Sequence, residues 1–202
     1  MKLFFMLFFS MISFNYSQAS GNGVTDIGNG GGGILCSSSG KSSLKVLDLY
    51  DMEAYYGWTV SKDIPSDFEG ALNAVFKRIK RFDPTFATEL REEYRIYRKE
   101  VRFVEDPLPN IGDIGRPIEA PSSCSFKQLA IQWEEGSKYG RRFLINRSLW
   151  KTLDGFNQAA LIIHELFYRI YLRHNRKYQI TSLYIRMYVA EVFSNGILNW
   201  AE

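Results

Sequence analysis

The sequence predicts an α+β domain in which a small antiparallel sheet of about four strands packs against four main helices. Long segments with apolar residues at helical spacing alternate with short segments of strand-like alternation bounded by glycine and polar turns. The chain has 202 residues, of which 46% are hydrophobic and 15% aromatic. Such a length and composition favour one folded domain with one substantial core.

The chain begins with the pattern of a cleavable secretory signal peptide. Lys2 supplies a positive charge, an apolar run from Leu3 to Phe14 follows, and Ser17 and Ala19 place small residues before a cut after Ala19. The apolar run is shorter than the roughly 20 residues that cross a bilayer. We therefore expect removal of residues 1–19, no membrane span in the mature chain, and a secreted or periplasmic location.

The segment after the predicted cut is dominated by glycine. Residues 20–33 predict a flexible leader, and residues 34–202 a single globular domain. Ile34 to Cys36 and Leu44 to Tyr50 are typical of two short strands joined as a hairpin around Gly40. The residues just after Tyr50 fit either an extension of the strand or a helical turn.

Two helices are predicted next. Ser66 and Glu69 form a Ser-x-x-Glu capping box, which predicts a helix over residues 67–82. Asp83, followed by proline, caps a second helix whose apolar stripe extends to Val104.

The second half of the chain begins with a proline-rich and glycine-rich stretch, residues 105–121, which predicts a long loop and a candidate wall for a binding cleft. Alternation predicts a strand from Phe126 to Trp133 with an antiparallel partner from Arg142 to Asn146. Three helical segments complete the domain: Ser148 to Leu153, Asn157 to His174, and a last helix from Thr181 or Ser182 to Asn195.

The chain has two cysteines, Cys36 and Cys124. In an oxidising compartment we expect them to form a disulfide, with two separately buried thiols as the alternative. Closing so long a loop would stabilise the fold by roughly 4 kcal/mol on the chain-entropy model. Cys124 as a nucleophile with His164 as its base is a further alternative, which the disulfide would abolish.

One predicted helix contains a motif whose residue types are typical of catalytic sites. Its stretch His164, Glu165, Leu166, Phe167, Tyr168 resembles the zinc-peptidase signature His-Glu-x-x-His, with tyrosine in place of the second histidine. Side chains at i and i+4 share one helix face and can share a metal, while the glutamate can take a proton from metal-bound water. The resemblance implies His164 as a zinc ligand and Glu165 as the catalytic general base.

The resemblance extends to His174, which lies where the metzincin pattern places its third ligand, so that His164 and His174 are the candidate metal ligands. Tyr171 replaces the glycine at which that family turns the chain. A continuous helix would carry His174 roughly 15 Å along the axis from His164. A zinc site would therefore need Tyr168 or a distant carboxylate such as Glu191 as a ligand.

Two metal-free interpretations of the same helix remain. In the first, His164 is a buried, hydrogen-bonded core residue, and Glu165 pairs with Arg169 on the flank. In the second, a polar network lines a ligand cleft without a metal. The members of that network are His164, Glu165, Tyr168, Arg169 and Arg186.

The charge distribution limits the partners. The net charge of +3 is too small to create a strong field, so we expect no nucleic-acid partner. A basic cluster marks the end of the same helix, where cations favourably oppose the helix dipole, and an anionic partner is the alternative. Its members are Arg169, Arg173, His174, Arg176 and Lys177.

Taken together, the glycine-rich leader, the strand ending in Cys36, the Leu47 to Tyr50 segment and the His-Glu-x-x-Tyr-Arg helix resemble exported, uncharacterised proteins of Bdellovibrio-type predatory bacteria. That resemblance implies export and a shared fold. We predict a non-catalytic or degenerate zincin-like domain that binds a protein or cell-envelope partner, with no cofactor. The alternative is a zinc-dependent, peptidase-like hydrolase with zinc as its cofactor.

Overall fold

The computed structural model has the predicted α+β class, and it describes residues 27–28, 31–38, 40–111, 120–133, 142–174 and 182–194. The helices are α2 (Leu47–Ala54), α3 (Phe68–Phe82), α4 (Pro84–Glu100), α5 (Arg147–Thr152), α6 (Gly155–His174) and α7 (Ser182–Phe193). The strands are β1 (Ile27–Gly28), β2 (Gly32–Ser38), β3 (Lys41–Val46), β4 (Val101–Val104), β5 (Cys124–Gln128), β6 (Ala130–Trp133) and β7 (Phe143–Asn146). The predicted signal peptide lies outside the described residues.

The strands form two sheets instead of the one that the sequence predicts. One has the order β1-β6-β7-β4, and the other the order β3-β2-β5. The pairing of β4 with β7 is parallel, and the remaining pairings are antiparallel. The strand predicted from Phe126 to Trp133 is divided at the buried Leu129, whose backbone N–H donates to the carbonyl of Gly31. That contact lets the chain pass from one sheet to the other.

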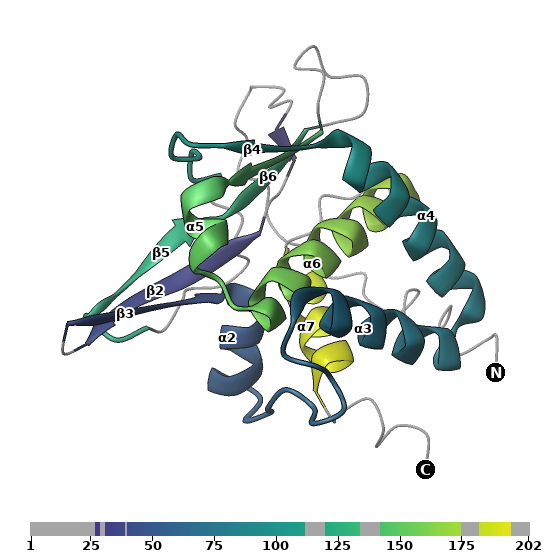
Figure 1. The fold of residues 1–202 in the computed structure, drawn as a ribbon, viewed down its shortest axis with the longest axis horizontal. Helices are drawn as coiled ribbons and strands as arrows, with labels where there is room; N and C mark the ends of the chain where they lie inside the picture. Colours follow the sequence, from purple (N-terminus) through teal and green to yellow (C-terminus); the bar gives the residue numbers. More distant parts are fainter. Residues whose placement is uncertain are drawn as a thin grey trace, which may run out of the picture.

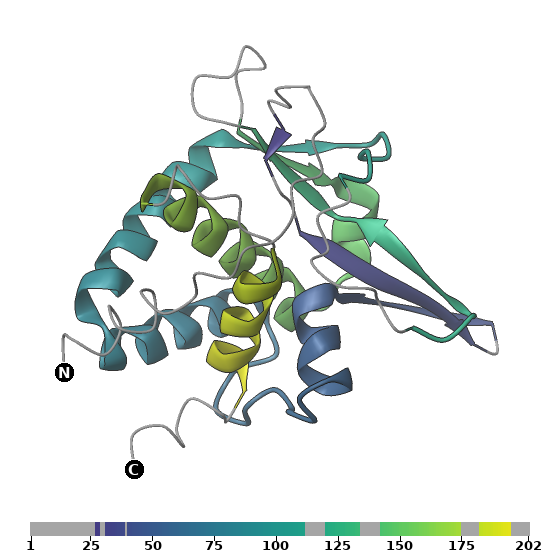
Figure 2. The same ribbon diagram turned by 180° about the vertical axis from the view of Figure 1, so that it is seen from behind.

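Helix α6 is the centre of the molecule. It contacts α2, α3, α4 and α7, and the helices α3, α4, α6 and α7 gather on one side while the sheets lie on the other (Figures 1 and 2). All of the residues from Ala159 to Ile170 are buried. Within the described residues, no helix is long and apolar enough to span a membrane.

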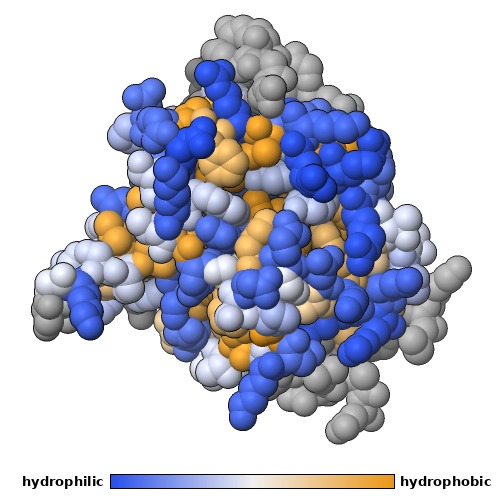
Figure 3. Space-filling model, viewed as in Figure 1, coloured by the Kyte–Doolittle hydropathy of each residue, from blue (hydrophilic) through white to orange (hydrophobic). Residues whose placement is uncertain are grey.

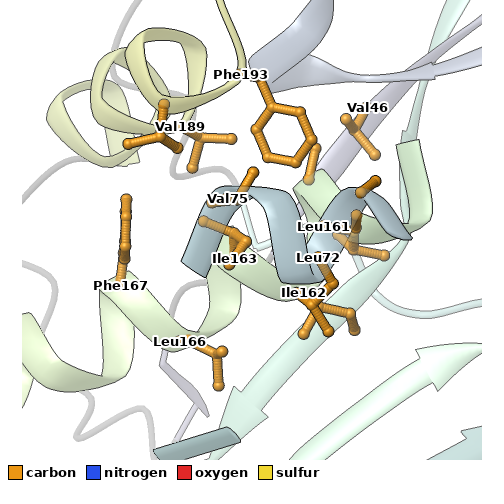
Figure 4. Close-up of a cluster of buried hydrophobic side chains, with 14 of the residues drawn as sticks. Val46, Leu72, Val75, Leu161, Ile162, Ile163, Leu166, Phe167, Val189 and Phe193 are labelled. Atoms are coloured by element: carbon orange, nitrogen blue, oxygen red, sulfur yellow. The ribbon is translucent and has the colours of Figure 1, made fainter. Parts of the chain in front are cut away.

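The hydrophobic core surrounds the middle of α6. Figure 4 shows Ile163 of this helix close to Val75 of α3 and on the side of α6 that faces Val189 of α7, while Leu166 points away from them. On the outside, the face drawn in Figure 3 carries mostly hydrophilic side chains around smaller hydrophobic areas. The polar groups of α6 therefore lie inside an otherwise apolar core.

The N-cap of α4 is the residue that the sequence predicts, whereas the N-cap of α3 is a different one. Asp83 caps α4 as predicted, because its side chain accepts from the backbone N–H of Phe86. Helix α3, however, is capped by Asp67 and not by Ser66: the Asp67 carboxylate accepts from Gly70 N. Helix α4 also ends earlier than predicted, because the residues after Glu100 form β4 beside β7.

The segment predicted as a strand up to Tyr50 is also different. The strand β3 ends at Val46, and α2 begins at the next residue. Asp48, Asp51 and Met52 are buried on one face of this helix, at helical spacing. The buried carboxylates of α2 face partners in α6 and α7, and these contacts favour the helix over an extended strand.

Candidate functional site

His164 lies in the middle of α6 and is hydrogen-bonded to a residue of α2. Its Nδ1 atom is 2.7 Å from Asp48 Oδ1, and both side chains are almost completely buried, with exposed fractions of 2% and 0%. Because an ionised carboxylate can only accept, Nδ1 is the donor. The pair links two helices that are far apart in the sequence.

The surroundings of His164 favour its protonated form. Burial alone would lower the pKa of the ring, but the carboxylates of Asp48 and Glu165 outweigh burial and raise it, against opposition from the charge of Arg186. A cationic imidazole is therefore more stable here than in water.

A second buried ion pair lies on the same side of α6. Arg186 Nη1 of α7 is 3.1 Å from Asp51 Oδ2 of α2, and both side chains are 2% exposed. Tyr168 and Arg169, the other residues of the predicted cleft, are also buried. The structure thus places these four residues inside the protein instead of facing solvent, and His164 and Arg186 each pair with an aspartate of α2.

Glu165 points toward the sheets. Its Oε1 accepts from the backbone N–H of Gly31 at 2.6 Å, and its backbone carbonyl accepts from Gln132 Nε2 at 2.7 Å. Burial raises the pKa of the Glu165 carboxyl, while His164 and the Gly31 N–H oppose that rise without cancelling it. The candidate general base is thus bonded to the chain's own backbone.

The contact with Gly31 depends on the absence of a side chain. A Cβ atom at this position would lie 2.1 Å from Leu161 Cδ1 and 3.0 Å from Glu165 Oε1. Gly31, Gly32 and Gly33 are all buried, and the latter two belong to β2. These three glycines, at the end of the predicted leader of residues 20–33, are therefore closely packed against side chains of the fold, and Ile27–Gly28 of the same leader form β1.

Some buried polar atoms of the cluster have no hydrogen-bond partner among the described residues. These atoms are His164 Nε2, Asp48 Oδ2 and Glu165 Oε2. Leaving a buried polar atom unpaired is unfavourable by about 1–3 kcal/mol. The cluster is therefore held by fewer hydrogen bonds than its groups could make.

The second candidate metal ligand lies elsewhere. His174, at the end of α6, contacts Glu89 of α4 and has a side chain that is 59% exposed. It therefore faces α4, whereas His164 faces α2. No group of three or more His, Cys, Asp or Glu side chains in the described part of the chain could hold a metal ion.

Two members of the basic cluster at the end of α6, Arg173 and His174, are paired with acidic residues of α4. Arg173 contacts both Glu93 and Glu89, and the Glu93 side chain is fully buried. Arg176 and Lys177 lie outside the described residues. Arg173 and His174 thus connect the end of α6 to α4.

The predicted disulfide joins Cys36 of β2 to Cys124 of β5, which are directly paired residues in neighbouring strands. The bond excludes Cys124 as a thiolate nucleophile. The described start of the predicted loop contacts the segment where β7 meets α5: Asn146 Nδ2 donates to Asp106 O, and Arg147 pairs with Glu105. Its described contacts therefore lie at the junction of β7 and α5.

Sequence reasoning missed the partners of the His-Glu helix. Asp48, Asp51 and Gln132 carry no motif, and Gly31 was hidden in a glycine run that predicts flexibility. The nearest signal was the pair of aspartates three residues apart between apolar residues, a spacing that places both on one helix face.

Comparison with protein-family models, curated proteins and solved structures gives no match. Any role for this chain must therefore be inferred from its own residues.

Proposed function

We propose that this protein is an exported, non-catalytic binding domain that retains a degenerate zincin-like helix. The main support is that both key groups of the motif are engaged inside the fold. His164 is bonded to Asp48, and Glu165 is bonded to the backbone of Gly31. A general base must be able to reach a metal-bound water, whereas the Glu165 carboxylate is fully buried and one of its oxygens is bonded to the backbone.

Two further observations support this proposal. The tyrosine at position 168 replaces a ligand of the zincin pattern, and His174 is directed toward Glu89. The disulfide is typical of proteins that fold in an oxidising compartment. The proposed partner is a protein or another component of the cell envelope.

The alternative, a zinc-dependent hydrolase, is favoured by one specific observation. A histidine that binds metal through one ring nitrogen usually donates its other N–H to a carboxylate. His164 has this arrangement, since Nδ1 contacts Asp48 while Nε2 has no hydrogen-bond partner among the described residues. Zinc would then need Nε2 together with ligands such as Tyr168.

Zinc content separates the two functions. We expect protein purified without a chelator or affinity tag to carry less than about 0.1 zinc per chain, well below the one metal expected of a tight site. If zinc approaches one per chain, the Glu165→Gln variant should keep it and lose any peptide hydrolysis. Zinc at that level, together with hydrolysis that Glu165→Gln removes, would contradict the binding-domain proposal.

A further inference from the structure

The Cys36–Cys124 disulfide lies near the surface, at the outer end of the sheet β3-β2-β5. Both cysteines are partly exposed, whereas Ile34, two residues before Cys36, is buried. Cys36 and Cys124 are the last registered pair of β2 and β5, and exposed serines follow Cys36 and flank Cys124. Figures 1 and 2 show the outer ends of the three strands projecting away from the helices. A reagent in solution can therefore approach this bond while the hydrophobic core stays closed.

The start of β5 is held against β2 at the surface of the protein. Beyond the last registered pair, the Ser37 N–H donates to the Ser123 carbonyl at 3.1 Å, and both residues are exposed. Backbone hydrogen bonds that are open to water and have few apolar neighbours open locally at little free-energy cost. Further along the two strands, the buried Ile34 is paired with Phe126. Breaking the disulfide should therefore loosen the start of β5 and leave the rest of the sheet paired.

A neighbouring hydroxyl favours one of the two sulfurs as the leaving group. Ser123 Oγ is 3.9 Å from Cys124 Sγ, where it can donate to a thiolate. Thiol–disulfide exchange begins with attack of a thiolate on one sulfur, and it is faster when the departing thiolate is more stable. Attack of a dithiol on Cys36 Sγ breaks the bond between the two protein sulfurs and releases Cys124 as a thiolate. The second thiol of the reductant then displaces Cys36, so that the protein gains two electrons and two protons and the reductant becomes a disulfide.

We propose that the Cys36–Cys124 bond is a redox switch of the folded protein: a dithiol cleaves it without unfolding the helices, and the start of β5 then separates from β2. Exposed disulfides are in general the labile and regulatory ones, whereas structural disulfides resist reduction. The switch couples the thiol–disulfide balance of the surroundings to the order of the surface at residues 121–125. It does not depend on the proposed binding function.

The first test measures how fast dithiothreitol reduces the native chain at urea concentrations below the unfolding transition. A bond that is open to attack in the folded state should be reduced at rates that differ by less than about twofold over this range, since urea acts mainly on the unfolding equilibrium. If reduction required global unfolding, its rate would rise with the unfolded population, which grows exponentially with urea concentration. Such a rise would overturn the proposal.

Two serine variants identify the departing sulfur. Ser123→Ala removes the hydroxyl beside Cys124 Sγ and should slow reduction by about twofold. The matched Ser125→Ala variant removes an exposed hydroxyl on the other side of Cys124 and should leave the rate unchanged. Equal rates of reduction in the two variants would contradict the release of Cys124 as the thiolate.

The second test locates the structural change by hydrogen exchange in the chain held in reductant. Reduction should raise the exchange rate of the Ser37 amide at least about tenfold relative to that of the Leu129 amide, because only the former lies beside the disulfide. The helical circular dichroism signal should be unchanged. Loss of that signal, or equal acceleration of exchange at both amides, would overturn the proposal.

Discussion

The two histidines of α6 each form a hydrogen bond with a carboxylate, His164 through Nδ1 and His174 through Nε2, but the two pairs differ greatly in solvent exposure. His164 is 2.7 Å from Asp48, and His174 is 2.8 Å from Glu89. The first pair has exposed fractions of 2% and 0%, and the second has 59% and 29%. The distance between the ring nitrogen and the carboxylate oxygen is therefore nearly equal in the two pairs, while their exposure to solvent differs greatly.

This difference in exposure indicates which pair contributes more to the stability of the fold. A buried charge that loses its partner cannot be solvated, whereas an exposed one exchanges its partner for water. The buried pair joins α2 to α6 beside the ion pair of Arg186 and Asp51. We therefore interpret the most motif-like residue of the chain, His164, as an internal link between helices.

Removing each imidazole gives the largest expected difference. The His164→Ala variant should lose about 3–5 kcal/mol of unfolding free energy, because Asp48 is left buried without its partner. The matched His174→Ala variant should lose at most about 1 kcal/mol. Urea denaturation followed by circular dichroism measures both, and similar losses in the two variants would remove the distinction between the pairs.

The pH dependence of stability should also separate the pairs. The folded-state pKa of His164 is raised above its ordinary value of 6.5, because Asp48 and Glu165 outweigh burial and Arg186. The folded state therefore binds the extra proton more tightly, and this stabilisation is fully present below about pH 6.5 and is lost as pH rises through the folded pKa.

The measurement is the stability difference between the native chain and a His164→Gln variant across that range. It should decrease as pH rises, since only the native chain carries the titrating ring. The His174→Gln variant is the control, and its stability should differ little from that of the native chain over the same pH range. If the stability difference between the native chain and the His164→Gln variant increases with pH, the folded-state pKa of His164 is not raised.

Salt should have the smallest effect. At about 1 M ionic strength the screening length is about 3 Å, so the contribution of the exposed pair should disappear. The loss caused by His174→Ala should therefore fall toward zero in 1 M salt, while that caused by His164→Ala should persist. A large salt effect on the His164→Ala loss would indicate that water reaches the buried pair.

Much of the fold follows from the sequence because local signals and packing agree. The long helix ending at His174, the Asp83 cap and the hairpin of β2 and β3 are examples. Where local signals and packing disagree, long-range contacts determine the secondary structure of the segment. Leu47 to Tyr50 has strand-like alternation, yet the buried partners of Asp48 and Asp51 fix a helix there.

The candidate site was predictable only in part. The His-Glu pattern identified one helix, but the pattern does not indicate which side chains cover it. Gly31 and Asp48 are separated from α6 by more than a hundred residues, with sequence separations of 134 from Glu165 and 116 from His164. Glycine in a run of glycines predicts flexibility locally and close packing only when the opposing helix is known.

The most direct test compares unfolding of the native chain in a chelator and in zinc. A native-state site with a dissociation constant of about 1 µM would add about 2.7 kcal/mol at 100 µM zinc. If His164 is an internal link, the unfolding free energies in the two conditions should be equal. If zinc raises the unfolding free energy of the native chain and of the His174→Ala variant but not that of the His164→Ala variant, His164 is instead a metal ligand.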